Sequence, residues 1–455
     1  MAIHKVLEPK IDQLFAEWDK SDSPGAALAV IRDGEIIYKR GYGMANLEYD
    51  IPITTTTIFD IASISKQFAG FAIATLLYEG KLSLDDDIRI YLPDVPDFGN
   101  TIKIRHLIHH TSGLRDWSQA LVIAGSEMDD VISFKHILKM VRHQKVLNFE
   151  PGTAFSYSNT GYNLLAEVVE TITGDSFREW TDTNIFKPLA MTNTHFHDEH
   201  EMLLKNRAYS YLSDGNDGFK NAVNNLTALG SSSLYSTVED LAKWVLNFDD
   251  TCIGDQTVVE QMHQRGVLNN GEQLNYAFGL NIGEYRALKM VEHGGAWRGF
   301  RSHIVRFPDQ KFAVIILSNL DTFRFRLTDE VIKLYLADVL GPEESEPDEV
   351  AQPVEGIKSR PLPPEQLTEF EGDYHTEELD TTYTIGVHEN QLVAQHIRHD
   401  DILLTYADGH FLGDSWFFPE VHFTRDNTGR VTGFKLTGDR VRNLYFQKKT
   451  HDNAH

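Results

Sequence analysis

The chain has 455 residues, which is long for one compact unit, so we expect two or three domains. Hydrophobic residues make up 41% and charged residues 24%, as in ordinary soluble globular proteins. The 42 Lys and Arg residues stand against 67 Asp and Glu, which gives a formal net charge of −25. Such a surface repels phosphate backbones and anionic lipids, so we expect neither nucleic-acid nor membrane partners. The simplest role of this negative charge is to keep the protein soluble.

The single cysteine, Cys252, excludes a disulfide within this chain and a cysteine-based metal cluster. The segment Met1–Lys10 carries charges where a signal peptide needs an apolar core. No apolar run approaches the length of a membrane span. We therefore expect a cytoplasmic protein, or a periplasmic or secreted one if a leader has been removed.

The first elements in chain order are a helix and a hairpin. Apolar residues recur at near-helical spacing over 5–18, and Pro24-Gly25 ends that pattern. The apolar runs 26–32 and 35–41 follow, and Asp33-Gly34 between them is typical of a tight β-hairpin turn.

A second pair of strands is predicted at 301–307 and 311–319, with a turn at Pro308-Asp309. Between the two hairpins the pattern is mostly helical, as in 164–173 and 237–246. We therefore expect an α/β (α+β) domain over residues 1–340. Its antiparallel sheet joins the two ends of the domain, is flanked by helices and carries a helical subdomain.

Residues 341–364 contain six prolines and an acidic run, which predicts a linker. Beyond it, short strands alternate with turn signals and predict a small closed barrel or sandwich over residues 365–455. The expected strands are 370–375, 382–388, 391–397, 402–406, 410–413, 416–424, 430–437 and 441–447.

The first chemical motif is Ser63-Ile-Ser-Lys66, at the start of the apolar stretch 61–77. Serine and lysine three residues apart lie on one helix face, and burial lowers a lysine pKa until its amine can accept a proton from serine. The N–H of Ser63, in a first helical turn, is free for an oxyanion. Alone, the pattern also fits a helix-capping serine with an exposed lysine.

The second motif is Tyr157-Ser158-Asn159, in a loop that enters a helix. A phenol beside a lysine can relay a proton, and an asparagine amide can hold both a substrate amide and the lysine. The structural alternative is a buried tyrosine and a helix-capping asparagine.

The third motif is His293-Gly294-Gly295-Ala296, before a strand. Glycines allow the backbone to approach a ligand closely, and the N–H of Ala296 is the candidate for a second oxyanion donor. The alternative is a simple tight turn.

In this order and at these separations the three motifs resemble those of the serine β-lactamase, DD-peptidase and family VIII esterase superfamily. The phrases that support the resemblance are Pro24-Gly-Ala-Ala-Leu-Ala-Val30, Leu107-Ile-His-His-Thr-Ser-Gly-Leu114, Ile185-Phe-Lys-Pro-Leu-Ala-Met191 and Ser236-Thr-Val-Glu-Asp-Leu-Ala-Lys-Trp244. The resemblance implies that Ser63 is acylated, Lys66 is the general base and Tyr157 passes the proton to the leaving group. It also implies that Asn159 binds the substrate amide and that the N–H groups of Ser63 and Ala296 form the oxyanion hole.

The third motif departs from the β-lactamase pattern, because His293, Gly294 and Gly295 stand where those enzymes carry lysine, then threonine or serine, then glycine. The missing groups normally bind a substrate carboxylate, so strong β-lactam hydrolysis is not expected. A histidine at this position resembles the third motif of D-aminopeptidases, some DD-peptidases and esterase-like members. His293 is expected to donate to substrate and to titrate near neutral pH. Trp297 and Arg298 follow as candidate pocket residues.

The C-terminal strands resemble the lipocalin-like domain of some D-amino-acid peptidases, through Phe370-Glu-Gly-Asp-Tyr374 and Glu378-Leu-Asp-Thr-Thr-Tyr383. Such a domain shapes substrate access, mediates assembly or only stabilises the chain. His106 and His110 have a metal-ligand spacing, but no third ligand is evident, so we expect no metal and no cofactor.

The sequence is compatible with three functions. The first is a serine peptidase acting on short or D-amino-acid-containing peptides. The second is a carboxylesterase of the same fold, since the same acyl-enzyme chemistry serves esters. The third is a catalytically silent scaffold protein. The expected partners are a small-molecule or short-peptide substrate and further copies of the chain in a homo-oligomer.

Overall fold

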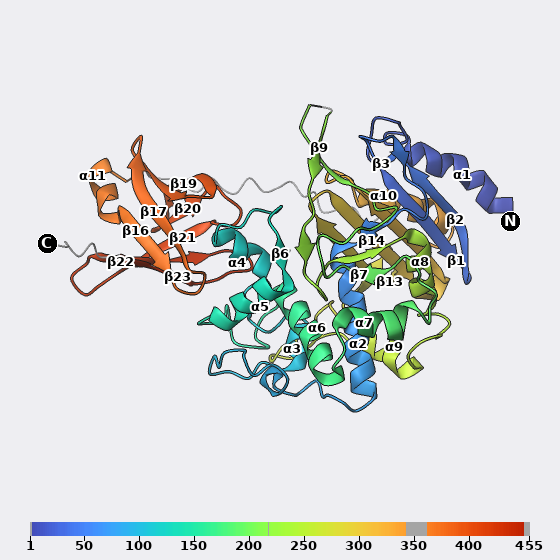
Figure 1. Cartoon of the computed structure of the whole chain (residues 1–455), viewed down its shortest axis with the longest axis horizontal. Helices are drawn as coiled ribbons and strands as arrows, with labels where there is room; N and C mark the ends of the chain where they lie inside the picture. Colours follow the sequence, from blue (N-terminus) through green and yellow to red (C-terminus); the bar gives the residue numbers. More distant parts are fainter. Residues whose placement is uncertain (1, 217, 343–361, 450–455) are drawn as a thin grey trace.

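The computed structural model describes residues 2–216, 218–342 and 362–449. They form two parts. The first combines helices with a sheet, and the second is a small barrel that lies to one side of the first (Figure 1). The predicted linker falls mostly on residues 343–361, outside the described residues. The helix α11 (Pro364–Leu367) begins at residue 364, where the linker is predicted to end. Among the described helices, none combines the length and the apolar character needed to cross a bilayer.

Six antiparallel strands form the central sheet, in the order β12-β13-β14-β15-β1-β2. Their bounds are β12 (Asn281–Tyr285), β13 (Leu288–Trp297), β14 (Phe300–Phe307), β15 (Phe312–Ser318), β1 (Ala26–Arg32) and β2 (Glu35–Tyr42). Both predicted hairpins are present, and β1 pairs with β15, so the two ends of the domain meet in one sheet as expected. Asp33 and Gly34 both have positive φ, 51° and 86°, as the tight turn requires.

The sheet is apolar on both faces because helices cover both. Along β1, Ala27, Ala29 and Ile31 belong to one hydrophobic core, whereas Leu28 and Val30 belong to the other. Helices α1 and α10 pack on the second face, and the helical part of the domain packs on the first. A continuous apolar strand is expected when both faces are buried.

The helices are α1 (Ala2–Phe15), α2 (Ser65–Tyr78), α3 (Ile104–Ile108), α4 (Trp117–Ile123), α5 (Phe134–His143), α6 (Asn159–Thr173), α7 (Phe177–Thr181), α8 (Val238–Leu246), α9 (Gln256–Met262) and α10 (Arg326–Leu336). Short strands join them: β3 (Met44–Asn46), β4 (Ile51–Pro52), β5 (Phe59–Asp60), β6 (Ile132–Ser133), β7 (His195–Phe196), β8 (Ser210–Ser213), β9 (Phe219–Ala222), β10 (Leu226–Thr227) and β11 (Leu234–Ser236). The stretch that begins at the first motif forms α2, which is buried on most sides, as its apolar composition predicts. It packs against α6 and α9.

The C-terminal part is a closed barrel of eight strands, which confirms the predicted barrel. Its strands are β16 (Gly372–Thr376), β17 (Thr381–His388), β18 (Gln391–His396), β19 (His399–Ala407), β20 (His410–Gly413), β21 (Glu420–Arg425), β22 (Val431–Thr437) and β23 (Leu444–Lys448). Aromatic side chains fill its interior, and the rings of Phe434 and Phe446 stack with centroids 4.6 Å apart.

The barrel lies beside α4 (Figure 1), and buried polar contacts join it to the rest of the chain. Arg115, which exposes only 2% of its side chain, donates from Nε to Glu378 Oε2 of the barrel at 3.0 Å. Its Nη1 donates to Asn148 Oδ1 at 3.0 Å and to the Arg442 carbonyl at 2.5 Å. Tyr383 of β17 donates to the Ile123 carbonyl at 2.9 Å. Buried hydrogen bonds and a buried ion pair therefore attach the barrel to the rest of the chain.

Candidate active site

Ser63 lies in the short 3₁₀ turn Ala62–Ile64, between β5 and α2. The turn is tight: Ala62 has a φ of 47°, a conformation that an L-residue with a side chain adopts at a cost. Asp60 holds it by accepting the Ala62 N–H at 2.8 Å and the Asn224 Nδ2 group at 2.7 Å. Burial raises the Asp60 pKa to about 6 despite these bonds.

Lys66 is fully buried and points at Ser63 from the first turn of α2. Its Nζ lies 3.1 Å from Ser63 Oγ, 2.7 Å from Asn159 Oδ1 and 2.8 Å from the Ser231 carbonyl oxygen. The two carbonyl oxygens only accept, so each takes one N–H. A neutral amine then has its lone pair left for the Ser63 hydroxyl. Burial lowers the Lys66 pKa well below its usual value, which favours that neutral form.

Asn159 is held by a buried carboxylate that sequence reasoning did not single out. Asp116 Oδ2 accepts the Asn159 backbone N–H at 2.5 Å and its Nδ2 group at 3.0 Å. Because Asp116 fixes the Nδ2 group, the amide of Asn159 is oriented so that its Oδ1 faces Lys66. Asp116 also acts on Lys66 directly, since its negative charge raises the lysine pKa and opposes the effect of burial.

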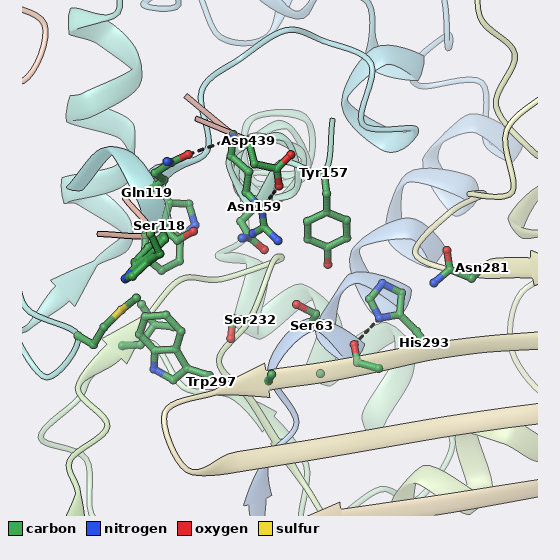
Figure 2. A pocket seen from close by; sticks show the side chains of 18 of the residues that line it. Ser63, Ser118, Gln119, Tyr157, Asn159, Ser232, Asn281, His293, Trp297 and Asp439 are labelled. Carbon is green, nitrogen blue, oxygen red and sulfur yellow. Dashed lines mark hydrogen bonds and ion pairs between the residues drawn. The ribbon is translucent and has the colours of Figure 1, made fainter. Parts of the chain in front are cut away.

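Tyr157 lies beside Ser63 and faces the pocket (Figure 2). Its ring packs against His110, with centroids 4.2 Å apart, and Lys66 Nζ lies 4.9 Å from its centroid. Burial raises the pKa of the Tyr157 phenol, and hydrogen bonding with Ser63 and the charge of Arg440 offset part of that rise. The phenol is therefore protonated at neutral pH and can donate.

His293 corrects one expectation, because it does not titrate near neutral pH. Burial lowers its pKa to about 4. Its Nδ1 lies 2.6 Å from the Gly294 carbonyl oxygen, so Nδ1 carries the proton. Its Nε2 then accepts from the Tyr276 hydroxyl at 2.9 Å. Both ring nitrogens are thus engaged within the protein, and no ring N–H remains for a substrate.

Gly295 lies directly against the Ser63 turn. A Cβ at this position would collide with Ser302 Oγ and the Ile61 carbonyl and come within 3.1 Å of the Ser63 nitrogen. Strand β12 pairs with β13 only as far as Glu292, so the following residues of β13 have one open edge, at which every second N–H lacks a sheet partner. The Ala296 N–H remains the predicted second oxyanion donor at this edge.

These residues surround a pocket of about 690 Å³. It is lined by Ser63, Trp117, Ser118, Gln119, Met128, Tyr157, Asn159, Leu226, Ser232, Asn281, Glu292, His293, Gly294, Gly295, Ala296, Trp297, Phe325, Trp416, Asp439 and Arg440. The structure thus brings together the predicted site residues around this pocket, with Lys66 buried behind Ser63. Arg298 is the exception: it lies in the β13–β14 turn with a φ of 47°, outside the lining.

Two polar atoms in the pocket wall have no hydrogen-bond partner among the described residues. They are Trp117 Nε1 and Ser232 Oγ, both buried. A buried unsatisfied group costs about 1–3 kcal/mol, and a bound ligand can remove that cost. Both atoms are therefore candidates for contact with polar groups of a substrate.

The barrel supplies part of the pocket, through Trp416, Asp439 and Arg440. Figure 2 shows Asp439 near Asn159 and Tyr157. The Arg440 guanidinium lies 5.2 Å from the centre of the Tyr157 ring, and its carbonyl accepts the Asp116 N–H at 3.2 Å. No pattern in the sequence marks these residues. Asp116, by contrast, lies two residues after the end of the quoted family phrase Leu107–Leu114, and this position could have drawn attention to it.

Comparison with known proteins agrees with this geometry. A family profile described as Beta-lactamase matches residues 11–337. The D-aminopeptidase of Gluconobacter oxydans is 30% identical over 315 residues, 69% of this chain and 58% of that protein. The chain spans between half and two thirds of the length of the curated relatives it matches.

Solved structures share the fold. The octameric penicillin-binding protein homologue from Pyrococcus abyssi has a TM-score of 0.65 at 24% identity, over 98% of this chain and 99% of that one. That likeness extends through the barrel. The D-amino acid amidase from Ochrobactrum anthropi SV3, complexed with L-phenylalanine amide, has a TM-score of 0.62 at 23% identity, over 74% and 99% of the two chains.

Proposed function

Because the chain belongs to the β-lactamase family, as the match over residues 11–337 shows, we propose that it is a serine hydrolase that forms an acyl-enzyme on Ser63. The contacts of Lys66 carry this proposal. Two carbonyl acceptors and a depressed pKa leave its amine lone pair directed at Ser63 Oγ, 3.1 Å away. A positioned base of this kind is what a serine hydroxyl needs in order to attack a carbonyl.

The reaction follows from the positions of these groups. Ser63 Oγ bonds to the substrate carbonyl carbon while its proton passes to Lys66 Nζ. The developing oxyanion accepts the N–H groups of Ser63 and Ala296. The bond to the leaving group then breaks as Tyr157 relays the proton to it, and the phenol recovers its proton from Lys66. Water hydrolyses the acyl-enzyme by the same steps in reverse order.

The substrate class that this site supports best is a short peptide or amide with a D-residue at its amino end. The charged groups lining the pocket are Glu292, Asp439 and Arg440. Glu292 pairs with His303 at 3.4 Å and exposes only 21% of its side chain. Asp439 pairs with its neighbour Arg440 at 3.8 Å, but 88% of its side chain is exposed and open to a ligand. Asp439 is therefore the available partner for a substrate ammonium. The relatives described as D-aminopeptidases support the same class.

Strong β-lactam hydrolysis is not part of the proposal. His293 takes the place of the usual lysine of the third motif, and its low pKa keeps it uncharged at neutral pH. It therefore offers no positive charge to a substrate carboxylate from that side of the pocket.

A substrate panel tests the proposal. D-alanyl and L-alanyl p-nitroanilides, D-Ala-D-Ala and p-nitrophenyl butyrate are compared with the wild-type chain and with Ser63→Ala. Ser112→Ala serves as the control, because Ser112 is a buried serine that lies outside the pocket lining. We expect turnover of the D-aminoacyl substrate, its loss in Ser63→Ala and its retention in the control.

Intact mass spectrometry completes the experiment with an activated ester or a fluorophosphonate probe. One adduct on the wild-type chain and none on Ser63→Ala supports the acyl-enzyme; no adduct on either supports the silent scaffold. Cleavage of esters with no cleavage of any amide would replace the peptidase by the carboxylesterase. The homo-oligomer stays a prediction, which light scattering after size exclusion tests.

A further inference from the structure

The outer wall of the barrel carries a cluster of metal-binding side chains far along the chain from the three motifs. His410 of β20 and Glu420 and His422 of β21 each offer one ligand atom, and these atoms all lie within 4.8 Å of one another. The two imidazole rings are nearly parallel, with centroids 4.6 Å apart. His422 Nε2 lies 3.3 Å from Glu420 Oε2.

The strand register explains why these three side chains converge. Phe411 pairs with Val421, and both are buried in the barrel interior. Because side chains alternate across a strand, their neighbours His410, Glu420 and His422 point outward together. The arrangement is therefore set by the sheet and not by a mobile loop.

We propose that His410, Glu420 and His422 bind a divalent transition-metal ion, Zn²⁺ or Cu²⁺. Imidazole nitrogens with one carboxylate are a donor set that suits both ions, and water completes the coordination. About 45% of each of the His422 and Glu420 side chains is exposed, so an ion reaches them from solvent. The formal net charge of −25 favours cations near this surface.

One cation competes with the ion. Lys435 of β22 pairs directly with His422, and its ammonium can approach the cluster. Lys435 also lines a separate hollow with Asn443 and Tyr445. Among the described residues Glu420 is ion-paired with His422 and with no lysine or arginine, so the three ligands remain available. Replacing Lys435 by glutamine is expected to tighten metal binding.

A bound ion ties β20 to β21 and thereby holds the connection between them. This connection carries Trp416, which lines the active-site pocket. It also carries Phe417, whose carbonyl accepts Gln119 Nε2 at 3.5 Å. The metal site itself is separate from that pocket, and its existence does not depend on the proposed hydrolase activity.

Isothermal titration of the full chain with ZnCl₂ tests the site, using the wild type, His422→Gln and Glu420→Gln. His388→Gln is the matched control, because His388 is an exposed histidine on β17 of the same barrel. We expect one Zn²⁺ per chain. We expect His422→Gln to weaken binding by roughly tenfold or more, because the loss of even an outer-sphere partner weakens metal sites by 10–100-fold. The control should bind as the wild type does.

Electron paramagnetic resonance with one equivalent of Cu²⁺ supplies an independent readout. Hyperfine coupling to two imidazole nitrogens in the wild type, and to one in His422→Gln, supports the site. No saturable Zn²⁺ binding, or equal binding in the wild type and His422→Gln, overturns it. Circular dichroism of each variant confirms that the exposed substitutions leave the fold intact.

Discussion

Replacing Gly295 by alanine tests how closely β13 and the Ser63 turn must approach. The added methyl group collides with Ser302 Oγ and the Ile61 carbonyl, and Ser302 itself donates to that carbonyl at 2.7 Å. Carbon atoms pack at about 3.5–4.0 Å, so the turn must move away from the strand. The Ser63 N–H, 3.1 Å from the methyl carbon, moves with it.

The displacement removes one donor from the oxyanion hole. Loss of such a donor lowers kcat by roughly 10²–10³-fold, or about 2.7–4 kcal/mol of transition-state stabilisation. Overpacking costs about 1–3 kcal/mol of folding free energy, so Gly295→Ala should still fold. We expect kcat to fall by that factor on the best substrate of the panel, with KM changed far less.

Gly294→Ala is the matched control, one residue away on the same strand. The atoms nearest to a Cβ there lie at 3.8 Å, which is ordinary contact. Steady-state kinetics on both variants, with thermal melting to confirm folding, decide the matter. Equal activity of Gly295→Ala and Gly294→Ala would refute the placement of the oxyanion hole.

Three further predictions concern the contacts around the site. Glu378→Gln leaves Arg115 buried without its carboxylate, so urea unfolding should show a loss of roughly 3–5 kcal/mol, and a loss below about 1 kcal/mol would contradict a buried ion pair. Arg440→Gln removes a positive charge that lowers the Lys66 pKa. Turnover needs the neutral amine and falls as the pH drops through that pKa, so the acidic limb of kcat/KM should move to higher pH. Asp116→Asn removes a charge that raises the same pKa and should move the limb to lower pH, with reduced activity; shifts of the same sign in both variants would count against Lys66 as the base.

The strands and the contact between Ser63 and Lys66 could be predicted from the sequence because each rests on a local pattern. Asp33-Gly34 specifies a turn with two positive φ angles, and the barrel strands alternate between interior and exterior residues. Ser63 and Lys66 are three residues apart in the chain, so any helical turn brings them together.

What the sequence could not predict depends on contacts between distant segments. The His293 pKa is set chiefly by burial, and its proton is placed by the Gly294 carbonyl, so a motif alone gave the wrong titration range. Arg440 reaches Tyr157 only because the barrel docks on α4, and docking of one domain on another leaves no periodic signal in either. Asp439 and Arg440, in the loop between β22 and β23, were therefore missed.

The loop between β22 and β23 makes the pocket a joint product of two folding units. The proposed nucleophile, base and oxyanion donors all come from the first unit, while Asp439 and Arg440 come from the second. The loop thus provides a proposed substrate contact, Asp439, and through Arg440 it also lies against Tyr157 and influences the pKa of Lys66. If the proposed activity holds, exchange of the six residues 438–443 is expected to alter the choice of substrate and the pH dependence together, without a substitution in the three motifs, which makes this loop the natural place to diversify in a library.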